Sequence, residues 1–85
     1  MQEEVRKLIH GRNFGFLATL NPDGSPQVTP VWVDEKDGYV LVNTAVGRVK
    51  ERNTRRDPRV ALAVPDWNDP YTYVEVRGRV VEWIT

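Results

Sequence analysis

The chain has 85 residues, of which 40% are hydrophobic and 28% are charged, and its twelve basic residues balance its twelve acidic ones. A chain of this size makes one small domain, so we expect residues 1–85 to form a single unit. Zero net charge removes any overall attraction to nucleic acid or to a membrane surface. The absence of cysteine excludes disulfides and thiol chemistry, and no apolar run is long enough to span a bilayer.

The first third of the chain is predicted to form a short helix followed by a β-hairpin. Residues 2–10 place three apolar side chains on one helical face, with two glutamates in the first turn. Residues 14–20 and 26–33 are strand-like. The Asn-Pro-Asp-Gly segment between them indicates a tight turn, because Pro presets φ and Gly supplies a positive φ.

Pro30 interrupts the second arm of this hairpin. Proline cannot donate a ladder hydrogen bond, so we expect this strand to lie at a sheet edge or to carry a bulge there. An edge strand has unpaired backbone groups, which can also meet a ligand. Residues 34–38 indicate another turn, and residues 39–44 a third strand.

The second half of the chain alternates between one basic helix and two further strands. We expect a helix at 48–56, a strand at 60–64, a loop at 65–70 and a long strand at 71–84. The helix must end before Pro58, and Gly78 predicts a bulge or a close backbone approach. Five antiparallel strands with two short helices predict a mainly-β fold, a small antiparallel barrel.

Six of the twelve basic residues lie between Gly47 and Val60. They are Arg48, Lys50, Arg52, Arg55, Arg56 and Arg59. They follow a buried strand and a glycine, and the first of them lie at the predicted start of a helix. A helix N-terminus presents free N–H groups and a favourable dipole to an anion, and Arg and Lys add charge-assisted hydrogen bonds. We therefore interpret this segment as a phosphate-binding corner.

With these segments in view, the chain resembles the pyridoxamine 5′-phosphate oxidase-like flavin-binding split β-barrels. It is most similar to their branch of oxidoreductases that use the deazaflavin coenzyme F420. The resemblance covers nearly the whole chain and is carried by three stretches, GFLATLNPDGSPQVTPVWVD at 15–34, VLVNTAVGRVKERNTRRDPRVALAV at 40–64 and YVEVRGRVVE at 73–82. The most specific part is the ordered combination of hairpin, NTA-x-GR-x-K and RRDPRVAL.

The resemblance implies a cofactor, FMN or F420, whose ring lies against the backbone of residues 28–31 and whose phosphate meets the basic corner. By position it assigns cofactor binding to Val28, Thr29, Pro30, Val31, Asn43, Thr44, Arg48, Lys50, Arg52, Arg55 and Arg56. It implies hydride transfer between the cofactor and a small organic substrate, with no catalytic side chain. The residues themselves predict no metal site, because one histidine, no cysteine and scattered carboxylates do not make a ligand set. The resemblance also implies a homodimer with the cofactor at the interface, to which Trp67 or Tyr71 contributes.

Two departures from the family pattern stand out. Thr54 occupies a position where the family usually has Leu. Family members also continue beyond the equivalent of Thr85 with a helix and a final strand that help to close the barrel and the substrate pocket. We therefore expect a split barrel that is incomplete at the C-terminus, as a truncated chain, a fragment or a minimal version of the fold.

Two other readings stay open at this point. Basic residues interleaved with aromatic ones on a small barrel also occur in nucleic-acid-binding modules, although zero net charge argues against this. The chain could instead be a structural fragment without a tight ligand. His10 is expected to be a solvated surface residue, and Trp32, Trp67 and Trp83 to serve the core or a dimer interface. The lack of cysteine favours a cytoplasmic location.

Overall fold

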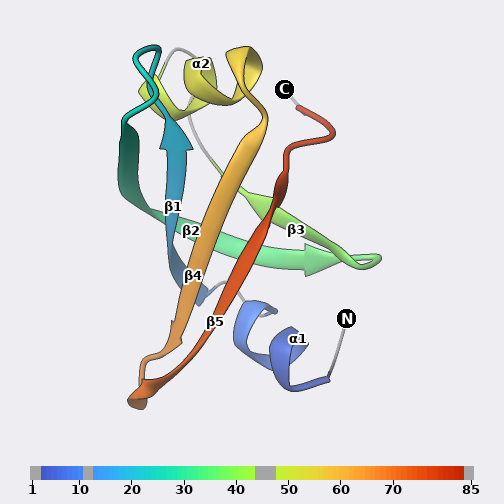
Figure 1. The fold of residues 1–85 in the computed structure, drawn as a ribbon. Helices are drawn as coiled ribbons and strands as arrows, with labels where there is room; N and C mark the ends of the chain where they lie inside the picture. Colours follow the sequence, from blue (N-terminus) through green and yellow to red (C-terminus); the bar gives the residue numbers. More distant parts are fainter. Residues whose placement is uncertain (1–2, 11–12, 44–47, 84–85) are drawn as a thin grey trace.

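The computed structural model describes residues 3–10, 13–43 and 48–83. Within these ranges two helices and five strands follow one another along the chain (Figure 1). Their bounds are α1 Glu3–Ile9, β1 Asn13–Leu20, β2 Pro26–Lys36, β3 Tyr39–Val42, α2 Val49–Arg56, β4 Arg59–Asp66 and β5 Asp69–Arg79. The predicted class, a mainly-β antiparallel split barrel with two short helices, is confirmed.

The five strands form one curled antiparallel sheet in the order β3-β2-β1-β4-β5. The long strand β2 changes partner along its length. It pairs with β1 from Pro26 to Val33 and with β3 from Val33 to Lys36 (Figure 1). Among the described residues, the part of β2 that contains Pro30 therefore has a neighbour on one side only. The prediction of an edge position for this proline is confirmed, and its missing N–H leaves no gap in a second ladder.

Burial alternates along β1, because successive side chains point to opposite faces of the sheet. Gly15, Leu17 and Thr19 are buried, whereas Phe14 and Phe16 are exposed. The core consists of buried aliphatic side chains from α1, β1, β2 and β4. These are Ile9, Leu17, Val31, Val33, Leu62 and Val64. Each such burial stabilises the fold by about 1.5–3 kcal/mol relative to an exposed side chain. Helix α1 closes one end of this core, because it packs against β2, β4 and β5.

Gly15 lies at a close approach between β1 and β4. A Cβ atom at this position would lie 3.0 Å from the Ala63 carbonyl oxygen and 3.1 Å from Val64 Cγ2. Gly78, where the sequence indicated a bulge or close approach, shows neither. It pairs with Val60 in an unbroken register, and a Cβ there would meet no described atom within 4 Å. The ladder irregularity lies instead at Pro65 and Asp66.

Three predicted boundaries were wrong, namely the end of β2, the extent of the loop at 65–70 and the end of β5. Strand β2 runs on to Lys36, so the turn before β3 contains only Asp37 and Gly38, both with positive φ. The predicted loop at 65–70 is mostly strand, because β4 and β5 continue to a two-residue turn at Trp67 and Asn68. The Asp66 carboxylate accepts the Asn68 N–H at 2.9 Å and so fixes that turn.

Strand β5 ends at Arg79 rather than at residue 84. Its partner β4 begins at Arg59, directly after Pro58. The last cross-strand bond is donated by the Val80 N–H to the Pro58 carbonyl, at 2.9 Å. The segment that precedes Pro58 is helix α2, so the residues that follow Val80 have no strand of that segment to pair with.

Helix α2 ends where the sequence predicted. Its last residue is Arg56, and Asp57 before Pro58 is extended, with φ −138° and ψ 109°. Neither described helix has the length and apolar character of a membrane-crossing helix.

Candidate functional site

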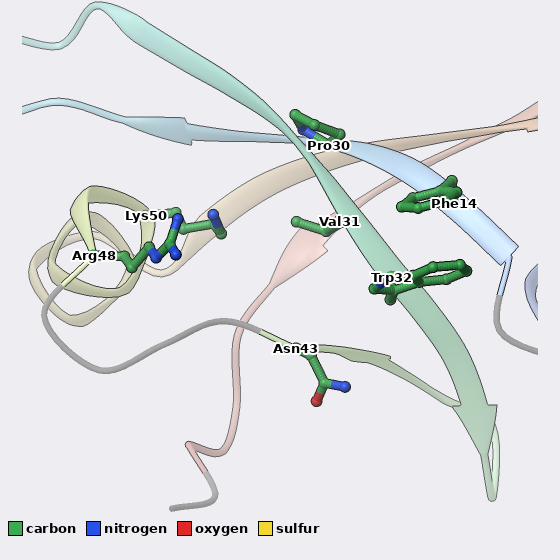
Figure 2. Close-up of a pocket in the computed structure, with 7 residues that line it drawn as sticks. All are labelled: Phe14, Pro30, Val31, Trp32, Asn43, Arg48 and Lys50. Atoms are coloured by element: carbon green, nitrogen blue, oxygen red, sulfur yellow. The ribbon is translucent and has the colours of Figure 1, made fainter.

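A pocket of about 430 Å³ lies between the edge of β2 and the start of α2 (Figure 2). Its lining combines aromatic and aliphatic side chains with an amide and two cations. These residues are Phe14, Pro30, Val31, Trp32, Asn43, Arg48 and Lys50. Only Val31 and Lys50 among them are buried, so the pocket is largely open to solvent.

The apolar wall of this pocket comes from the edge segment of β2. Along Pro30, Val31 and Trp32 the burial alternates, so Val31 enters the core while the other two side chains stay exposed. Because β3 pairs with β2 only from Val33 onward, this segment has no strand partner on its second side among the described residues. Asn43 follows β3, and its N–H donates to the Trp32 carbonyl at 3.4 Å.

The Phe14 and Trp32 rings extend the apolar wall. The two residues are direct cross-strand partners in the β1–β2 ladder. Their ring centroids lie 3.7 Å apart with an interplanar angle of 28°, which is a stacked arrangement. Sequence reasoning missed Phe14, although the hairpin register set by the turn at 21–24 contains this pairing. A flat ligand ring would find an apolar surface beside them.

The cationic end of the pocket comes from the start of α2. Arg48 is the N-cap residue and its backbone is extended, with φ −69° and ψ 156°. Its side chain makes no capping hydrogen bond, because a guanidinium has no acceptor for the free N–H groups of the first turn. Lys50 lies in the first turn and is only 9% exposed. Figure 2 shows both side chains reaching from α2 toward β2.

Arg48 and Lys50 differ from Arg55, Arg56 and Arg59, whose side chains have ion-pair or hydrogen-bond partners within the described residues. Neither forms an ion pair with any residue in the described part of the chain. Lys50 is a mostly buried residue, so its charge is less well hydrated than one on the surface and has no described acidic partner to compensate. An anion placed between Arg48 and Lys50 would compensate this charge, and the first N–H groups of α2 would assist it.

The cations further along the segment are already engaged. Arg55 pairs with Glu51 at 3.0 Å and lies 5.3 Å from the Trp83 ring centroid. Arg56 donates to the Leu20 carbonyl and to Asn53 Oδ1. Arg59 pairs with Asp57 at 2.7 Å, and its hydrogen bonds lower the pKa of that carboxyl to about 2. These three cations serve the protein's own structure.

The structure therefore divides the predicted cofactor residues into two groups. One pocket brings together Pro30, Val31, Asn43, Arg48 and Lys50. The predicted residues that do not line it are Val28, Thr29, Arg52, Arg55 and Arg56. Thr44 lies outside the described residues.

The other singled-out residues lie elsewhere. His10 is exposed and faces Asp34, with Nδ1 3.3 Å from Oδ1. Trp83 donates its indole N–H to Thr54 Oγ1 at 3.2 Å, so the residue that departs from the family pattern has a polar partner of its own. Trp67 contacts Phe14 and Phe16 edge-on or tilted, with ring centroids 6.4 Å apart in both cases. Within residues 3–10, 13–43 and 48–83, no three His, Asp or Glu side chains gather into a metal site.

Comparison with known proteins agrees with this architecture. The family model described as pyridoxamine 5′-phosphate oxidase matches residues 1–83. A solved structure named as an F420 reductase is 36% identical with a TM-score of 0.86, and the match covers 96% of this chain and 65% of that one. A conserved hypothetical protein from Mycobacterium tuberculosis is 34% identical with a TM-score of 0.77, covering 93% of this chain and 51% of that one.

A third solved structure, of a protein of unknown function from Agrobacterium tumefaciens, is 27% identical. Its TM-score is 0.75, and the match covers 88% of this chain and 35% of that one. The chain thus spans between about one third and two thirds of the length of these three structures.

Proposed function

We propose a function from the fact that the chain belongs to the pyridoxamine 5′-phosphate oxidase family. In this proposal the chain is an oxidoreductase domain that binds a phosphorylated flavin or deazaflavin. The phosphate lies between Arg48 and Lys50 at the start of α2. The ring lies along the edge of β2 at residues 28–31.

One observation carries this proposal. Two cations without described acidic partners, one of them buried, stand beside an apolar wall on an edge strand. A phosphorylated flavin has the same two-part character, because it joins a flat apolar ring system to an anionic group. The residues of the pocket therefore fit the group that the family implies.

When bound, the cofactor supplies hydride transfer to or from a small organic substrate. The chain's own residues bind and orient it. Arg48 and Lys50 hold the phosphate through charge-assisted hydrogen bonds. The β2 backbone at residues 28–31 has a described strand partner on one side only, so its other side offers hydrogen-bonding groups to the ring edge. Because the cofactor supplies the chemistry and the chain binds and orients it, no acidic or basic side chain is needed at the reacting atoms.

The choice between FMN and F420 rests on which cations already have partners within the chain and on the names of the similar structures. The two pocket cations without partners among residues 3–10, 13–43 and 48–83 match one phosphate group, which both cofactors carry. A longer anionic tail on the cofactor would need further cations, but Arg55, Arg56 and Arg59 already have partners within the chain. The 36% identity to a protein named as an F420 reductase favours F420.

A homodimer with the cofactor at the interface belongs to the same proposal. Four exposed aromatic residues form what we call the aromatic face, namely Phe14, Phe16, Trp32 and Trp67. Phe14 and Trp32 also line the pocket, so a second copy on this face would cover the cofactor. Trp67 or Tyr71 would then contribute to the partner's site. The expected cytoplasmic location stays a prediction.

Equilibrium binding of three ligands tests the proposal. The 85-residue chain is titrated at moderate salt with FMN, with F420 and with riboflavin, which lacks the phosphate, and binding is read by fluorescence. We expect saturable micromolar binding of FMN or F420 and much weaker binding of riboflavin. Failure of both phosphorylated ligands to bind would overturn the assignment, and binding of nucleic acid that falls steeply with salt would replace it.

A further inference from the structure

Asn53 lies in the middle of α2 with its side chain only 2% exposed. Its amide group is fully used. Nδ2 donates to Thr19 Oγ1 and to Asn21 Oδ1, both at 3.0 Å, and Oδ1 accepts from Arg56 Nη2 at 3.1 Å. A buried amide with both donor hydrogens and its oxygen engaged has one orientation, so Asn53 fixes its surroundings precisely.

These bonds join α2 to the tip of the β1–β2 hairpin, more than thirty residues away in sequence. The hairpin tip is itself well defined. The Asn21 N–H donates to the Ser25 carbonyl at 2.8 Å, and Thr19 Oγ1 donates to Gln27 Oε1 at 3.2 Å. Arg56 adds a second link by donating to the Leu20 carbonyl. The hairpin therefore offers a rigid frame to which the helix is bonded.

Helix α2 has no apolar anchor that could replace these bonds. Its eight residues, all of which the structure describes, bury only Lys50, Asn53 and Thr54. Apolar packing tolerates sliding, whereas hydrogen bonds are directional and weaken steeply when their geometry changes. The position of α2 on the sheet is thus set mainly by polar contacts.

Asn53 stands three residues after Lys50, so the two side chains share one face of the helix. A shift of α2 at Asn53 would move the Lys50 ammonium and the adjacent Arg48 relative to β2. We propose that Asn53 is a positioning residue for the phosphate site, which it serves by bonding α2 to the hairpin tip. This inference rests on the proposed function, because it concerns how the two phosphate-binding cations are placed.

The test compares Asn53→Ala with Thr54→Val, a matched control one residue away. Thr54 is also buried, but its hydroxyl bonds to Trp83 and to the Glu51 carbonyl, not to the hairpin. Urea unfolding measures the stability of each variant, and titration with FMN, F420 and riboflavin measures affinity. A purely structural role would lower stability without changing the preference for a phosphorylated ligand over riboflavin.

We expect Asn53→Ala to weaken binding of the preferred phosphorylated cofactor about tenfold, the size of one lost charge-assisted contact, and to leave riboflavin binding unchanged. Thr54→Val should keep the preference. Asn21→Ala, which removes one acceptor at the hairpin surface, should reproduce part of the loss if Asn53→Ala fails to fold. In a Lys50→Ala background the effect of Asn53→Ala should shrink, because Asn53 acts through that cation.

The outcomes separate this inference from the proposed function. If the unaltered chain prefers the phosphorylated ligand and both Asn53→Ala and Asn21→Ala keep that preference, Asn53 is structural only and the inference fails. If the unaltered chain binds neither FMN nor F420, the proposed function fails and the inference with it. Full additivity of Asn53→Ala and Lys50→Ala would also overturn it.

Discussion

Arg48 and Lys50 differ from Arg55, Arg56 and Arg59 because their side chains have no ion-pair or hydrogen-bond partner among the described residues. We expect Arg48→Ala combined with Lys50→Ala to weaken binding of FMN or F420 by several kcal/mol, since two charge-assisted contacts at about 1.5–3 kcal/mol each are lost. Riboflavin affinity should change little. Fluorescence titration of the double variant with each ligand measures both effects.

The control for this double variant keeps the change in net charge constant. Arg77→Ala combined with Arg79→Ala also removes two positive charges, from the exposed side of β5. If the loss were an effect of overall charge, both double variants would show it equally. Equal losses would therefore contradict a specific phosphate site at the start of α2.

Asp57 gives a prediction about pH. Hydrogen bonds from Arg59 lower the pKa of the Asp57 carboxyl from 3.8 to about 2. A carboxyl whose folded pKa is depressed stabilises the fold above its unfolded pKa, and this contribution is lost as pH falls from about 4 toward 2. Arg59→Ala should return the Asp57 pKa toward 3.8. A carboxyl ¹³C NMR titration follows the change, and an unaltered midpoint in the variant would refute the assigned cause.

Sequence reasoning could locate the basic corner but could not sort its cations. A glycine and a basic run after an apolar strand are local signals, so the start of α2 was predictable. The burial expected for that strand was wrong, because β3 has no buried residue. The pairing of Arg55 with Trp83 and of Arg56 with Leu20 joins segments about thirty residues apart. Such contacts depend on how the helix docks on the sheet, which no local pattern encodes.

At the level of elements, β1 and β4 approach so closely that a Cβ atom at position 15 would lie only 3.0–3.2 Å from three atoms of β4. We expect Gly15→Ala to destabilise the fold by about 1–3 kcal/mol, because the new Cβ would press on the Ala63 carbonyl and on two core side chains. Gly78→Ala is the matched control, since its Cβ would enter open space among the described atoms. It should stay within about 0.5 kcal/mol of the parent.

Urea unfolding of the two glycine variants provides the measurement. Similar losses for Gly15→Ala and Gly78→Ala would mean that the close approach of β1 and β4 is not a source of strain. The pair also shows a limit of sequence reading. Both glycines lie inside strands, and the sequence indicated a bulge or close approach at Gly78, not at Gly15. Local sequence could not distinguish them, because the atoms that surround a strand glycine depend on how the strands pack.

The β1–β2 hairpin was predictable because its turn chemistry is local and Pro30 restricts its strand to an edge. The β4–β5 turn was not, since two prolines and three Asp or Asn residues within 65–70 are typical of a loop. Pro65 is tolerated in β4 because β1 pairs with that strand only from Ala61 to Ala63. Tertiary pairing with Tyr73 then overrides the local preference.

At the scale of the whole molecule, the curled sheet turns the aromatic face outward beside the open pocket. A cluster of exposed aromatic rings next to a binding pocket is typical of an interaction surface. We predict that a second copy covers it, and that Phe16→Lys shifts the chain to monomer, because a charge would be buried without a partner. Sedimentation equilibrium measures the change in association.

Cofactor affinity gives this prediction a second and independent readout. If the partner completes the pocket, dilution below the dimer dissociation constant should weaken FMN or F420 binding, and Phe16→Lys should weaken it at all concentrations. Tyr39→Lys, an exposed aromatic position on β3 outside the aromatic face, should change neither association nor affinity. A dimer that survives Phe16→Lys would place the interface elsewhere. Affinity independent of concentration would mean that one protomer holds the cofactor alone.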